Sequence, residues 1–373
     1  MQRIDFLLNS GRWAFDAEPR YTSALLLASA QPPSHDHRVE VAGVADSAVR
    51  FARQSAAEGL ALSPEALGPL LEVPLLPSQA AADLLGKLRR GTPFALGAKR
   101  WRCFPVAEFH ETNDRALWQS ATSGRPLWKG ESFDQYDPHG REARVCPADE
   151  SALSKQLKPN PGAGSILARE TSREDRVAAV RQELTRARLA FRDVTNRTNS
   201  RTVIAAMVPP NVFLTNKAPY LAFVGGSELD QTCCLAIMNS IVFDWQARRF
   251  VETNVNFFIL EGLRLPELSG EQYSRLASSA ARLSCTREEF SALAEATQVD
   301  VAELHPEEQA ELRAEIDAVV AHAYGLAPDD LEAVFSDFTL DAVTHEYRDL
   351  VRRSFARAPK EASARQETAS SSR

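Results

Sequence analysis

Residues 188–210 have the sequence RLAFRDVTNRTNSRTVIAAMVPP, in which a polar stretch rich in Arg and Asn precedes an apolar one. The apolar part, Arg201–Met207, contains β-branched residues and stops before Pro209 and Pro210. This composition and this ending predict a buried strand. Upstream, residues 166–191 are polar and Arg-rich with apolar residues at helical spacing, which predicts that part of the segment is a helix.

Further elements follow on the C-terminal side of this strand. Tyr220–Val224 is a short apolar run ended by two glycines, which predicts a second strand. Residues 228–250 lack Gly and Pro over a length that suits a six-turn helix, and Asn254–Leu260 again has the composition of a strand. The predicted order is therefore strand, strand, helix, strand.

The N-terminal part predicts a mixed segment. Short apolar runs at 24–28 and 38–44 predict strands, and leucines at helical spacing predict a helix over 78–90. Residues 118–164 are rich in Gly, Pro, Asp and Ser, which predicts long loops with short strands.

Beyond residue 269 every periodic segment is helical, so the sequence predicts an α+β protein. We expect a mixed α/β domain with long loops over 1–268, an all-α C-terminal helical region over 269–357, and a polar disordered tail over 358–373.

Composition excludes several classes of protein. The 373 residues, with 44% hydrophobic and 25% charged, are typical of a globular chain long enough for at least two domains. No apolar run has the length of a membrane span, and the first residues do not form a secretion signal, so we expect a cytoplasmic protein. Five cysteines without a CxxC pair, and scattered histidines, favour neither disulfides nor a metal site.

Charge is unevenly distributed along the chain. The formal net charge is −7, but residues 300–350 hold 14 acids and two Arg, so residues 1–299 are close to neutral. The densest basic stretch, Arg173–Arg201, has eight Arg against four acids. This asymmetry permits a DNA-facing body, and solvated helix faces balanced by local acids are an equally good interpretation of the charge alone.

The common motifs of enzyme sites are absent from the sequence. It contains no GxxxxGK[ST], GxGxxG, GxSxG or HExxH pattern, and no carboxylate spacing typical of a nuclease. The adjacent glycines in Phe223–Ser227 are most simply a chain bend. The residues alone therefore predict no catalytic and no cofactor-binding site.

A family resemblance is carried by six segments in order along the chain. They are Phe109–Trp118 (FHETNDRALW), Pro126–Asp137 (PLWKGESFDQYD), Arg188–Pro210, Asn239–Arg248 (NSIVFDWQAR), Asn254–Pro266 (NVNFFILEGLRLP) and Glu315–Leu326 (EIDAVVAHAYGL). Together they resemble the target-recognition region of adenine-specific (N-6) DNA methyltransferases of the type IIG and BREX-like kinds. Trp13–Leu27 resembles the entry into that region, so the likeness spans most of residues 13–335.

The resemblance implies recognition without catalysis. Enzymes of this family bind S-adenosylmethionine in an N-terminal domain with an Asn-Pro-Pro-[Tyr/Phe] motif that holds the flipped adenine. This sequence lacks that motif, because in Val208–Asn211 the Asn follows the prolines. The cofactor is therefore expected on a catalytic partner, and double-stranded DNA and that methyltransferase subunit or domain are the expected partners.

DNA recognition requires basic side chains for phosphates and Arg, Lys, Asn or Gln for base edges. The residues of those types in the two relevant segments are Lys129, Gln135, Arg192, Asn196, Arg197, Asn199 and Arg201. We predict that they contact DNA. The alternative is that such polar groups cap or bridge the fold, since the TNRTNSRT stretch directly precedes a predicted buried strand.

Three hypotheses remain open at this point. The chain is the recognition subunit of a split methyltransferase, a fragment of a single-chain methyltransferase, or a standalone interaction protein that has lost DNA binding. Salt-dependent DNA binding separates the third hypothesis from the first two, because phosphate contacts make the affinity fall as salt rises.

Overall fold

The structure is a computed structural model that describes residues 2–16, 22–32, 34, 36–62, 74, 76, 78–94, 101–141, 143–157, 160–161, 165, 169–196 and 199–370. Contacts between Cα atoms divide the chain into an N-terminal unit (residues 1–90) and a C-terminal unit (residues 91–373). Helices and sheets occur together, and the C-terminal part is helical, so the expected α+β class is confirmed.

In the N-terminal unit the described residues form a four-stranded sheet of order β2-β1-β3-β4. Its elements are β1 (Arg3–Leu8), β2 (Thr22–Leu27), β3 (Val39–Ala45), β4 (Leu60–Leu62), α1 (Ala48–Ser55) and α2 (Gln79–Leu88). Strand β1 pairs antiparallel with β2 and parallel with β3, and β4 is antiparallel to β3. The strands predicted at 24–28 and 38–44 and the helix predicted at 78–90 are therefore present.

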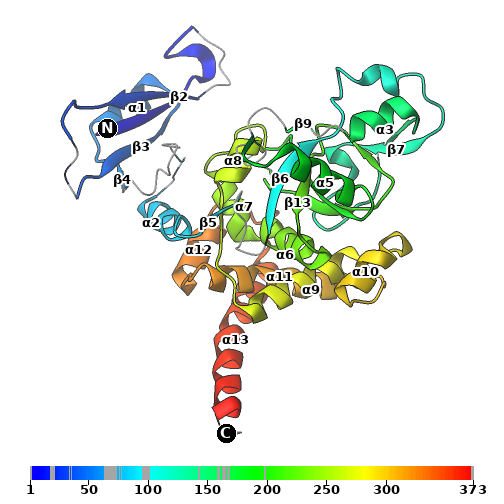
Figure 1. The fold of residues 1–373 in the computed structure, drawn as a ribbon. Helices are drawn as coiled ribbons and strands as arrows, with labels where there is room; N and C mark the ends of the chain where they lie inside the picture. The colour runs from blue at the N-terminus through cyan, green and yellow to red at the C-terminus, as the bar shows by residue number, and fades with distance from the viewer. Residues whose placement is uncertain are drawn as a thin grey trace. The chain divides into compact units, whose positions relative to one another are not determined.

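The C-terminal unit is built on a sheet of order β11-β10-β13-β6-β9, counted over its described residues, in which all neighbours are antiparallel. The strands are β6 (Arg102–Ala107), β9 (Asn160–Pro161), β10 (Arg188–Phe191), β11 (Ala205–Val208) and β13 (Tyr220–Val224). Every residue of β10 and β11 is buried, because α5 (Arg173–Glu183) packs on the sheet from one side and α6 (Glu228–Asn239) also contacts it (Figure 1). Burial on both sides fits the apolar composition of the strand predicted at Arg201–Met207, but β11 begins only at Ala205, and the buried residues 202–204 precede it.

The segment predicted as loops with short strands contains a second sheet. The strands are β7 (Arg125–Trp128), β8 (Arg144–Cys146) and β12 (Phe213–Leu214), in the order β12-β7-β8, and α3 (Glu150–Gln156) follows β8. A short pair joins β5 (Thr92–Pro93) to β14 (Arg264–Leu265).

Helices complete the C-terminal unit. They are α7 (Ile241–Arg248), α8 (Phe257–Gly262), α9 (Gly270–Ser284), α10 (Ser291–Thr297), α11 (Pro306–Ala323), α12 (Pro328–Ser336) and α13 (His345–Ser370). Helix α9 packs along α6, and α11 packs against both α9 and α13 (Figure 1). The contacts group residues 91–373 into one unit, and the division expected at 268/269 stays a prediction. Helix α13 also continues into the tail expected to be disordered from residue 358, a stretch rich in the helix formers Ala, Glu, Arg and Gln.

The long helix predicted over residues 228–250 is two helices. Ser240 has extended φ and ψ of −68° and 150°, and its hydroxyl caps α7 by accepting a hydrogen bond from the Phe243 amide. The preceding Asn239 exchanges side-chain hydrogen bonds of 3.0 and 2.9 Å with the backbone of Ala205 in β11. Asn and Ser compete with helical hydrogen bonding when such partners exist, which ends α6 at this point.

The strand predicted at Asn254–Leu260 is wrong. These residues lead into α8, which begins at Phe257. The ring of Phe257 packs edge-on against Phe191 of β10, with ring centroids 6.3 Å apart. A short aromatic and β-branched run fits a strand or a buried helical turn, and here tertiary packing selects the helix.

A buried ion pair lies beside the main sheet. Arg188 of β10 donates a hydrogen bond of 2.8 Å to Glu108, and both side chains are almost fully buried. Arg188 also donates to the Val212 carbonyl and lies over the Tyr220 ring, and Gln156 donates to Glu108. The polar first residue of RLAF is thus part of the scaffold.

Within the described part of the chain, no helix has the length and apolar character needed to cross a membrane.

Candidate nucleic-acid interface

The residues before β11 are held by one buried carboxylate. Asp244 of α7 is fully buried, and its Oδ1 accepts hydrogen bonds of 2.7 and 2.6 Å from the amides of Thr202 and Val203. Its Oδ2 accepts a bond of 2.9 Å from Nε of Arg248, one helical turn further along α7. We call this arrangement the Asp244 clamp.

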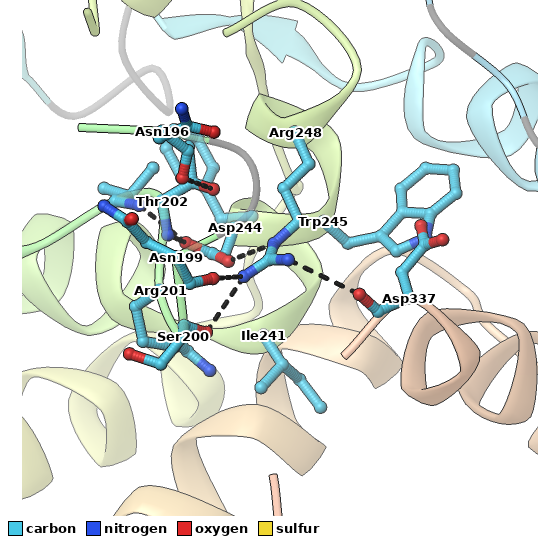
Figure 2. Close-up of polar contacts among 12 residues, drawn as sticks. Asn196, Asn199, Ser200, Arg201, Thr202, Ile241, Asp244, Trp245, Arg248 and Asp337 are labelled. Carbon is cyan, nitrogen blue, oxygen red and sulfur yellow. Dashed lines mark hydrogen bonds and ion pairs between the residues drawn. The ribbon is translucent and has the colours of Figure 1, made fainter. Parts of the chain in front are cut away.

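Arg248 extends the Asp244 clamp to the preceding loop. Its Nη2 donates to the carbonyls of Asn199 and Ser200, at 2.7 and 2.9 Å, and Nη1 donates to the Asp337 carbonyl (Figure 2). The guanidinium also lies 4.2 Å from the centre of the Phe338 ring. Every one of these bonds is made to backbone or to Asp244, so the clamp fixes the path of residues 199–203 without using their side chains.

Two of the predicted DNA-contacting residues meet inside the fold. Arg201 donates to the Asn239 carbonyl and lies 5.7 Å from the centre of the Phe338 ring. Gln135 donates to the carbonyls of Val203, at 2.8 Å, and Asn239, at 3.3 Å. The structure therefore brings Gln135 and Arg201 together around Asn239, where both stabilise the start of β11.

Lys129 and Arg192 are paired with acids. Arg192 donates to the Phe133 carbonyl and forms an ion pair of 2.5 Å with Asp134, while Lys129 forms one of 2.6 Å with Glu131. Both acids are more than half exposed, at 54% and 69%, so these pairs are in contact with solvent and are weak.

Asn196 and Asn199 precede the clamp in the chain. The Asn196 carbonyl accepts a bond of 3.3 Å from the Thr202 hydroxyl, and Arg197 lies outside the described residues. The Asn199 side chain is exposed and makes no hydrogen bond to any residue that the structure describes. Asn199 is thus presented to solvent at the start of the segment 199–203, whose backbone the clamp holds.

A polar pocket of about 580 Å³ is lined in part by Ser200 and Arg201. It shares lining residues with a smaller pocket of about 170 Å³. Residues common to both pockets are Gln135, Tyr136, Arg201 and Arg313. Arg313, from α11, was missed by the sequence analysis. Its only signal is a basic residue within an otherwise acidic stretch, and that pattern is also typical of a solvated helix face.

Asp317 lines the smaller pocket and is buried. Its two oxygens accept bonds of 2.8 Å from the Ile241 amide and 2.7 Å from the Tyr347 hydroxyl. Burial raises the pKa of Asp317 to about 6, although the charges of Arg201 and Arg313 act to lower it. Two guanidinium groups and one carboxylate thus share this interior.

No family model and no curated protein matches the sequence. Among solved structures, the chain is similar to the type IIL restriction-modification enzyme MmeI, determined in complex with DNA, with 14% identity over 70% of this chain and 35% of MmeI at a TM-score of 0.30. It is also similar to the type IIG restriction endonuclease BpuSI, with 9% identity over 68% of this chain and 34% of BpuSI at a TM-score of 0.36. The chain therefore spans about a third of the length of each enzyme.

Removing the central carboxylate tests the Asp244 clamp. Asp244→Ala leaves two buried amides and the Arg248 guanidinium without their acceptor, so we expect the free energy of unfolding to fall by about 3–5 kcal/mol. Asp244→Asn keeps an oxygen that can accept from the two amides, so we expect a smaller fall in the free energy of unfolding for this variant. Urea denaturation of both variants measures this, and equal stability of Asp244→Ala and wild type would contradict the clamp.

The raised pKa of Asp317 predicts a dependence of stability on pH. The folded pKa of about 6 lies above the ordinary value of 3.8, so the native state retains a proton that the unfolded state has lost. Stability therefore falls as pH rises from about 4 to about 6, by about 3 kcal/mol relative to Asp317→Asn, whose amide does not titrate. Denaturation of both proteins at several pH values tests this, and parallel stability curves would show that Asp317 does not titrate in this range.

Proposed function

We propose that this chain performs DNA sequence recognition for an adenine-specific DNA methyltransferase of a restriction-modification or phage-defence system. The observation that carries the proposal is the Asp244 clamp together with Asn239. These contacts join 188–210 to 239–248, which are two of the segments that resemble the recognition region of such enzymes. Two of the segments that carry the resemblance are thus joined by hydrogen bonds in the fold.

Catalysis is assigned to a separate methyltransferase subunit or to a domain absent from this sequence. That partner would bind S-adenosylmethionine and supply the Asn-Pro-Pro-[Tyr/Phe] motif that this sequence lacks. In the turn Phe223–Ser227, the Gly226 carbonyl accepts hydrogen bonds from Gln182 and Arg186, and Ser227 caps α6.

The loop that ends at the Asp244 clamp is the proposed base-reading segment. An asparagine side chain can pair with the N6 and N7 edge of adenine, and Asn199 is exposed on a fixed backbone. Arg192 and Lys129 would exchange their exposed carboxylates for backbone phosphates. Specificity would then come from the loop and orientation from the two cations.

Binding to duplex DNA tests the proposal. A target duplex is first selected from a randomised pool with the wild-type chain, and its affinity is then measured over a range of salt concentrations. We expect affinity to fall steeply with salt, and Asn199→Ala to weaken binding to the selected duplex by about 1–3 kcal/mol without lowering the thermal midpoint.

Asn113→Ala is the matched control, since Asn113 is also an exposed asparagine but lies in the loop after β6. It is expected to bind as the wild type does. A duplex affinity that does not change with salt concentration, or failure to select any duplex, would contradict the proposal and favour a standalone interaction protein.

A further inference from the structure

Two arginines from distant parts of the chain line the same polar pocket. Arg201 precedes β11 and Arg313 comes from the middle of α11, and both side chains border the larger and the smaller pocket. Both charges also act on Asp317, Tyr136 and Tyr347, so the two guanidinium groups share one environment. Like charges placed together are unfavourable unless an anion lies between them.

Protein groups satisfy these arginines only in part. Arg201 donates to the Asn239 carbonyl, and Arg313 donates to the Gln135 carbonyl at 3.1 Å. Neither makes an ion pair with a carboxylate of the described residues, and the Nε atom of each is shielded from solvent without a hydrogen-bond partner there. Buried donors without partners are costly, so the described protein groups leave both guanidinium groups incompletely satisfied.

The Asp317 carboxylate is not the anion that accepts hydrogen bonds from Arg201 and Arg313. Both of its oxygens are engaged, one by the Ile241 amide and one by the Tyr347 hydroxyl. The smaller pocket, counted over its described lining, therefore has two guanidinium groups against one carboxylate, an excess of positive charge.

The larger pocket widens toward a mixed rim. Arg287 adds a third guanidinium there, while Asp134, Asp137 and Glu303 are acidic. Asp134 is already paired with Arg192, and Arg287 with Glu289 at 3.3 Å. Asp137 and Glu303 make no ion pair among the described residues, so the rim carries net negative charge, and the positive charge is concentrated at the wall shared by the two pockets, where Arg201 and Arg313 are.

We infer that this pocket binds a phosphate group, held by the Arg201 and Arg313 guanidinium groups, with the rest of the ligand in the larger pocket. The planar fork of donors in Arg suits phosphate oxygens, and the volume of about 580 Å³ suits a ligand as large as a nucleotide. A phosphate of the DNA backbone and a free nucleotide present the same chemistry. The inference therefore does not depend on the function proposed above.

Calorimetric titration of the full chain with inorganic phosphate and with dAMP, in chloride buffer, tests the pocket. Arg313→Gln removes one guanidinium. Arg282→Gln is the matched control, since Arg282 likewise donates to a backbone carbonyl and, although it also pairs with Glu308, lies outside the pocket lining. We expect saturable binding to the wild type and to Arg282→Gln, and at least about tenfold weaker binding to Arg313→Gln.

Duplex binding distinguishes the two sources of phosphate. A weaker duplex affinity of Arg313→Gln, with a salt slope lower by about one, would assign the pocket to the DNA backbone. An unchanged duplex affinity with weaker dAMP binding would assign it to a free nucleotide. Arg313→Lys, which keeps the charge but loses the fork, is expected to bind less tightly than wild type and serves as the second variant if Arg313→Gln does not fold.

Failure of this inference differs from failure of the proposed function. If the wild type binds neither inorganic phosphate nor dAMP and the Arg313 variants bind the duplex as Arg282→Gln does, the pocket is not a phosphate site. If phosphate or dAMP binds but no duplex does, the phosphate site is supported and the proposed DNA recognition is contradicted.

Discussion

A single buried carboxylate, Asp244, determines where the candidate interface lies. It accepts hydrogen bonds from two backbone amides and from Arg248, and Arg248 in turn fixes the carbonyls of the loop before β11. Because Asp244, the two amides and Arg248 are buried, the loss of the carboxylate leaves its donors unsatisfied in a medium that cannot replace it. The backbone of residues 199–203 is thus held in place while the Asn199 side chain remains exposed.

The same arrangement connects the sheet with the C-terminal helices. Asn239 ends α6 and bonds β11, and Asp317 of α11 accepts from the first amide of α7. These contacts place Arg201 and Arg313 at one pocket, although they are more than a hundred positions apart in the sequence. The sheet and the helical region therefore form one unit, and the proposed phosphate site belongs to both.

Local patterns explain which features the sequence could predict. Tyr220–Val224 was predicted because an apolar run before paired glycines is typical of a buried strand, and the predicted helices beyond residue 269 follow clear apolar periodicity. The break at Ser240 depends on the bonds that Asn239 makes to Ala205, which no local pattern contains.

Side-chain direction was less predictable than secondary structure. Arg201 has the composition expected of a DNA contact, yet it points to the Asn239 carbonyl, and Arg188 is buried against Glu108. Charge in a sequence does not specify whether a guanidinium faces solvent or interior. Asn199 and Arg201 are two positions apart, and only the tertiary contacts of the clamp separate an exposed side chain from an internal one.

Hydrogen exchange at individual amides, measured with and without the selected duplex, tests the central claim most directly. The account predicts slow exchange at Thr202 and Val203 in the free chain, because both amides donate to buried Asp244, and additional protection of residues 199–200 when the duplex is bound. Fast exchange at Thr202 and Val203, or no change at residues 199–200 on binding, would contradict a fixed loop that reads DNA.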